Sequence, residues 1–60
     1  MKNFIEILVN GEKCIVNINA IQNVCPLEEG GCTINLLEGS IKCIRTEMDY
    51  EELSKILLGD

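Results

Sequence analysis

The stretch from Cys32 to Leu58 constrains the fold most, because its apolar residues change from strand spacing to helix spacing. Residues 33–37 and 40–44 form two apolar runs on either side of Glu38-Gly39. Glycine adopts positive φ at low cost, so this pair predicts a two-residue hairpin turn. Such a turn would place one alternating set of side chains on the inner face of the hairpin: Ile34, Leu36, Ile41 and Cys43.

After Arg45 the apolar spacing becomes helical, which predicts a helix over residues 49–58. Asp49 followed by Glu52 is typical of an N-cap with a capping box, and Gly59 is expected to end the helix. The helix is expected to bury an apolar stripe against the sheet, which comprises Tyr50, Leu53, Ile56 and Leu57.

The first part of the chain predicts a second hairpin. Asn10-Gly11, between the strand-like runs 4–9 and 12–18, is the strongest short signal for a hairpin turn. A two-residue loop would direct one set of side chains inward: Ile5, Ile7, Val9, Cys14, Val16 and Ile18. The opposite face is half apolar, since Phe4, Leu8 and Ile15 alternate there with polar residues, and we interpret it as a candidate contact surface.

Between the two hairpins, the asparagines of residues 17–23 indicate a turn. Residues 22–27 are predicted to form a short strand, with Pro26 at an edge or a strand end because proline has no amide hydrogen to donate. Residues 28–31 are predicted to be a loop. The expected fold is therefore mainly β with one helix (α+β): an antiparallel sheet of four or five strands, built from two hairpins, with the C-terminal helix packed on one face.

The length of the chain makes folding marginal. Residues 1–60 form a single domain, and a chain this short buries only about 60% of the surface that its unfolded form exposes. Nevertheless, 47% of the residues are hydrophobic, which is difficult to bury within a monomer. We therefore expect a homo-oligomer whose interface lies on the outer face of the sheet, formed by Phe4, Leu8, Ile15 and Ile44.

The charge argues against two classes of partner. The net charge is −5, and the five cationic residues are scattered along the chain, whereas nucleic-acid binding requires clustered lysine and arginine. No apolar run approaches the ~20 residues that span a bilayer, so we expect no membrane partner. The first residues lead directly into a strand-like run without the pattern of a signal peptide, and we expect a cytoplasmic location.

Four cysteines could bind a metal ion, but their spacing does not favour it. Cys14, Cys25, Cys32 and Cys43 are too far apart for the C-x₂₋₄-C pairs that are typical of zinc sites. We expect Cys14 and Cys43 to act as small apolar core residues. Cys25 and Cys32 flank one loop, so a disulfide between them could form, although a reducing cytosol would keep it open.

The sequence does not indicate an enzyme. Histidine is absent, which removes the usual general base and the usual partner of a nucleophile. The paired acids Glu28-Glu29 and Glu51-Glu52 are neighbours on a loop and on a helix turn, where they hold no fixed separation across a substrate. We expect neither catalysis nor a cofactor.

Two segments resemble the FlbD-like family of short bacterial proteins, which are associated with flagella or swarming motility. These are Thr33-Ile-Asn-Leu-Leu-Glu-Gly39 and the acidic helix start Asp49-Tyr-Glu-Glu-Leu53. The order of strand, glycine, strand and helix is also similar to the DNA-binding LytTR domain, although this chain is shorter and acidic. The FlbD-like resemblance implies a fold and a loose role, without functional residues to carry over.

The function expected from these observations is a small non-catalytic protein-interaction or regulatory module, associated with motility or regulation. Two alternatives remain open at this point. One is a LytTR-like nucleic-acid-binding domain, and the other is a module that binds metal through its four cysteines.

Overall fold

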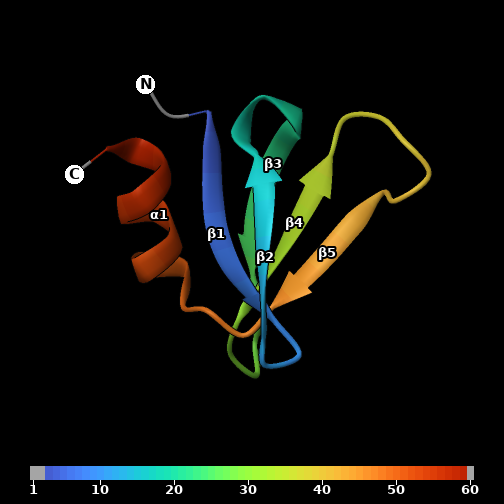
Figure 1. Ribbon diagram of the computed structural model, residues 1–60. Helices are drawn as coiled ribbons and strands as arrows, with labels where there is room; N and C mark the ends of the chain where they lie inside the picture. Colours follow the sequence, from blue (N-terminus) through green and yellow to red (C-terminus); the bar gives the residue numbers. More distant parts are fainter. Residues whose placement is uncertain (1–2, 60) are drawn as a thin grey trace.

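The computed structural model describes residues 3–59, which fold into five strands and a C-terminal helix around one core (Figure 1). The elements in chain order are β1 (Phe4–Val9), β2 (Glu12–Asn17), the 3₁₀ turn η1 (Ile18–Ala20), β3 (Ile21–Pro26), β4 (Cys32–Leu36), β5 (Cys43–Thr46) and α1 (Tyr50–Leu58). The predicted mainly β fold with one C-terminal helix is confirmed.

The five strands are divided between two antiparallel sheets. β1 and β2 form one, and β3, β4 and β5 form the other in that order. The chain leaves the first sheet at η1, where the Asn17 side chain accepts a hydrogen bond from the amide of Asn19 at 2.9 Å. This contact turns the chain at the asparagine-rich segment, as the sequence predicted. The two sheets face each other across the core. The strands therefore do not form the one sheet of four or five strands that the sequence predicted.

The first hairpin has the predicted register. Ile7 pairs with Cys14 and Ile5 with Val16. Asn10 and Gly11 have φ values of 55° and 81°, and positive φ at both positions suits the tight turns that match the twist of paired strands. Because the loop has only these two residues, the register follows directly from the turn.

The second hairpin differs from its prediction by one residue. Ile34 pairs with Ile44 where Cys43 was expected, and the amide of Leu36 donates to the carbonyl of Lys42 at 2.8 Å. The amide of Leu37 instead donates to the carbonyl of Ala20, at 2.9 Å, so the loop already begins there. A shift of one residue reverses the faces of a strand. Cys43, a predicted core residue, is consequently exposed, and Ile44 packs against the core. Ile41, which was also predicted to lie in the core, is in the loop before β5 and is exposed.

β3 and the helix begin and end close to their predicted positions. β3 ends at Pro26, as expected for a residue without an amide hydrogen. Asp49 is the N-cap of α1, but its side chain makes no capping hydrogen bond, so the predicted capping box does not form. Gly59 ends the helix with a φ of 82°, and its amide donates to the carbonyl of Lys55 at 3.1 Å.

The core draws side chains from both sheets and from the helix. α1 packs on the β3 side of the molecule, and Leu53 is fully buried, whereas the predicted stripe residues Tyr50 and Ile56 are exposed. The buried apolar cluster consists of Ile7, Val16, Cys32, Ile34, Met48 and Leu53.

Replacing Leu53 by alanine is expected to destabilise the fold by about 2–5 kcal/mol, because it leaves a cavity between the sheets and the helix. The matched control on the same helix is Leu58→Ala, since Leu58 is 82% exposed and its removal should change stability by less than about 0.5 kcal/mol. Urea denaturation of both variants measures the difference. Equal effects would contradict this position of α1.

Gly31 and Gly30 provide a second matched pair. Both have positive φ, but a Cβ on Gly31 would lie 2.5 Å from the carbonyl oxygen of Thr46, while a Cβ on Gly30 would meet no atom within 4 Å. Gly31→Ala should therefore cost clearly more stability than Gly30→Ala, which carries only the backbone strain of about 1 kcal/mol. Thermal unfolding of the two variants tests this, and an equal loss would show that β5 does not approach Gly31 as described.

Candidate functional site

The outer face of the first hairpin exposes three apolar side chains. Phe4 is 56% exposed, Leu8 37% and Ile15 73%. Ile15 lies opposite Glu6 on β1 and is therefore diagonal to both Phe4 and Leu8. Diagonal neighbours on one face of a sheet lie within reach of long side chains. The three residues thus form one apolar patch with Ile15 at its centre, which we call the hairpin face.

Ile44 was predicted to belong to the same interface, and this prediction is wrong. The shifted register of β5 turns Ile44 inward, where it is half-buried and packs against the core. The hairpin face therefore consists of Phe4, Leu8 and Ile15, all from β1 and β2.

The hairpin face also carries one acidic and one basic side chain. Glu6 lies opposite Ile15, and Lys13 lies opposite Leu8. These two residues alternate with the apolar side chains and are exposed. The face can therefore contact a partner through apolar side chains flanked by one negative and one positive charge.

The backbone of this hairpin is held by the last residue of β5, Thr46, and by Glu47, which follows it. The hydroxyl of Thr46 donates a hydrogen bond to the carbonyl of Leu8, and it accepts one from the amide of Met48 at 3.2 Å. The Glu47 carboxylate accepts hydrogen bonds from the amides of Asn10 at 3.1 Å and of Gly11 at 2.8 Å. Figure 1 shows the turn between β1 and β2 beside the end of β5. These contacts fix the hairpin through backbone atoms of β1 and of the turn, and do not involve the side chains of the hairpin face.

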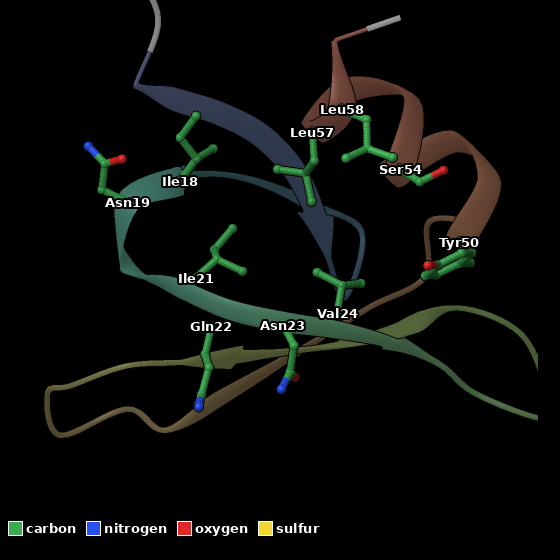
Figure 2. A pocket seen from close by; sticks show the side chains of 10 residues that line it. All are labelled: Ile18, Asn19, Ile21, Gln22, Asn23, Val24, Tyr50, Ser54, Leu57 and Leu58. Carbon is green, nitrogen blue, oxygen red and sulfur yellow. The ribbon is translucent and has the colours of Figure 1, made fainter.

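A second apolar feature is a groove of about 370 Å³ between β3, η1 and α1 (Figure 2). Ile21 and Val24 point into it from β3, and Leu57 and Leu58 point into it from the helix, whereas Gln22 and Asn23 point away from the helix. The only titratable side chain in its lining is that of Tyr50. The groove could therefore hold an uncharged apolar group.

The sequence did not predict this groove. The sequence does contain one signal for the groove, which is the pair of adjacent leucines Leu57 and Leu58. A helix that packs on a sheet through a single apolar stripe needs only one of the two, so the second is available to line a groove. The walls of the groove come from segments far apart in the sequence, and their approach follows from the tertiary structure alone.

The four cysteines do not converge. Cys25 and Cys43 are exposed, Cys14 is half-buried, and Cys32 is fully buried, where its Sγ donates to the carbonyl of Met48 at 3.4 Å. Cys32 pairs with Pro26, and Cys25 pairs with Thr33, so Cys25 and Cys32 point to opposite faces of the sheet. Within residues 3–59, no group of three or more cysteine, aspartate or glutamate side chains is placed to hold a metal ion.

The environment of Cys32 also changes its chemistry. Burial is the main cause that raises the pKa of this thiol, and the negative charge of Asp49 raises it further. Cys32 was not predicted to be a core residue. The signal was present, because Cys32 lies two residues before Ile34 and strand alternation places both on the same face.

The four thiols should react with iodoacetamide at different rates, because the thiolate is the reactive form and must be reached by the reagent. Cys25 and Cys43 should be alkylated fastest, Cys14 more slowly, and Cys32 only when the chain unfolds. Peptide mass spectrometry of the native protein measures the order, with urea-denatured protein as the control. Rapid native alkylation of Cys32 would contradict its burial.

None of the helices within residues 3–59 is long and apolar enough to cross a membrane. Comparison with protein-family models, with curated proteins and with solved structures finds no match to this chain. The resemblance to the FlbD-like family and to the LytTR domain therefore stays a prediction from the sequence.

Proposed function

We propose that the chain is a small non-catalytic protein-interaction module, and that it associates with a second copy of itself through the hairpin face. The observation that carries this proposal is the exposure of Phe4, Leu8 and Ile15 together on one face of a two-stranded sheet. Contiguous apolar patches of this kind are typical of interaction surfaces.

The total surface of the chain supports this proposal. The accessible surface is 4520 Å², whereas the size scaling of monomeric proteins gives roughly 3,900 Å² for a mass of 6.7 kDa. The chain therefore exposes more surface than a typical monomer of its mass, which is the direction expected of a chain that buries further surface against a partner. Burying about 100 Å² on each of the three apolar side chains would contribute roughly 2.5 kcal/mol per residue.

The charges of the hairpin face are compatible with a two-fold contact. In a symmetric dimer the same patch meets itself, so it must be complementary to its own copy. An axis that passes near Ile15 would bring Glu6 of one copy towards Lys13 of the other, while the apolar side chains meet at the centre. Such a rim of opposite charges favours the correct orientation of the two copies.

We also propose that the module acts in the cytoplasm and in a regulatory setting. The four cysteines are free thiols, which is the state that a reducing cytosol maintains. The regulatory setting rests on the FlbD-like resemblance of residues 33–39 and 49–53.

The variant Leu8→Glu tests the interface, because it places a charge in the hairpin face and leaves the backbone carbonyl that binds Thr46 in place. We expect the dissociation constant of the dimer to rise by at least about 100-fold, since the loss of one buried leucine and the burial of a charge each cost more than a kcal/mol. Sedimentation equilibrium measures this constant.

The matched control for this experiment is Leu37→Glu, because Leu37 is 55% exposed and lies in the loop after β4, outside the three residues that form the hairpin face. It should leave the dimer intact. A wild-type monomer at roughly millimolar concentration would reject self-association, and dissociation by Leu37→Glu alone would place the interface elsewhere. Binding of duplex DNA at low salt would favour the nucleic-acid alternative.

A further inference from the structure

The turn between β1 and β2 combines two features that bear on its chemical stability. Asn10 is the only asparagine of the chain that is followed by glycine, and both residues are exposed. Glycine has no side chain to hinder its own amide, so this pair is the chain's most open site for attack of a backbone amide on an asparagine side chain. The amide that would attack is the one that Glu47 binds at 2.8 Å.

We propose that Asn10 is a deamidation site, and that the Glu47 carboxylate slows its deamidation. In the reaction the amide nitrogen of Gly11 loses its proton and forms a bond to Cγ of Asn10. The bond between Cγ and the side-chain nitrogen breaks, and that nitrogen leaves as ammonia. Water then opens the resulting succinimide at one of its two carbonyls, which yields aspartate or isoaspartate. No oxidant, reductant or further reactant is required.

The position of Glu47 opposes the first step of this reaction. The proton that must leave Gly11 points to the Glu47 carboxylate, and its loss would place a second negative charge beside the first. A neighbouring charge of the same sign disfavours the charged form of a group. A carboxylate is also a far weaker base than an amide anion, so it does not remove the proton itself. The second hydrogen bond, from the Asn10 amide, fixes the turn against the rotation that ring closure needs.

The product would alter the hairpin permanently. Isoaspartate adds one carbon to the main chain, and the two-residue loop with positive φ at both positions cannot accommodate it unchanged. The amides of residues 10 and 11 would no longer match the two oxygens of Glu47. Deamidation would therefore detach the tip of the hairpin from the end of β5, independently of whether the hairpin face binds a second copy.

The test compares the full-length chain with the variant Glu47→Gln during incubation in a mildly alkaline buffer. Glutamine keeps the shape of the side chain but removes its charge. We expect deamidation at residue 10 to become faster by on the order of tenfold, which is the scale of a hydrogen bond to a charged group. Peptide mass spectrometry measures aspartate and isoaspartate at residue 10, and Asn19, which precedes alanine, serves as the internal reference.

Two controls separate this role from general destabilisation. Leu57→Ala weakens the core from the helix, away from the turn, and should accelerate deamidation at residue 10 much less than Glu47→Gln does. The second control is the wild-type chain unfolded in urea. Unfolding should accelerate deamidation at Asn10 by a larger factor than it accelerates deamidation at Asn19. An equal acceleration by Leu57→Ala, or equal native and unfolded rates at Asn10, would overturn the proposal.

Discussion

The structure depends on the contact between the end of β5 and the first hairpin. Within residues 3–59 the two sheets are not joined by a shared strand pairing, so the hydrogen bonds between them come from side chains. Thr46 is 3% exposed, and its hydroxyl links the carbonyl of Leu8 to the amide of Met48. Glu47 adds two bonds to the turn, and Gly31 leaves room for the carbonyl of Thr46. The apolar core can close because this corner sets the spacing of the two sheets.

Local turn chemistry explains which parts of the fold could be predicted. Asn10-Gly11 determines the first hairpin by itself, because two residues with positive φ leave one register for the strands beside them. Glu38-Gly39 carried a similar signal, yet that register was wrong. The amide of Leu37 binds the carbonyl of Ala20, and this contact with a distant segment lengthens the loop. Short-range patterns do not contain that information.

In the candidate site, too, the features set by local sequence could be predicted, and those set by contacts between distant segments could not. Strand alternation was enough to predict that Phe4, Leu8 and Ile15 share an exposed face, because their hairpin has a locally determined register. Ile44 was wrongly assigned to this face because the register of β5 differs from the predicted one by one residue. Such a shift moves every side chain of the strand to the opposite face of the sheet. The groove beside α1 and the contacts of Glu47 each unite segments distant in sequence, and so required the tertiary structure.

The end of β3 determines how readily a further strand can add to the three-stranded sheet. β3 is an edge of the three-stranded sheet, and such edges are templates on which further strands can add to form fibres. Pro26 has no amide hydrogen to offer an incoming strand, and the irregular register between Ile21 and Asn23 interrupts the regular spacing that strand addition requires. The β3 edge of the three-stranded sheet is therefore unsuited to the addition of a further strand.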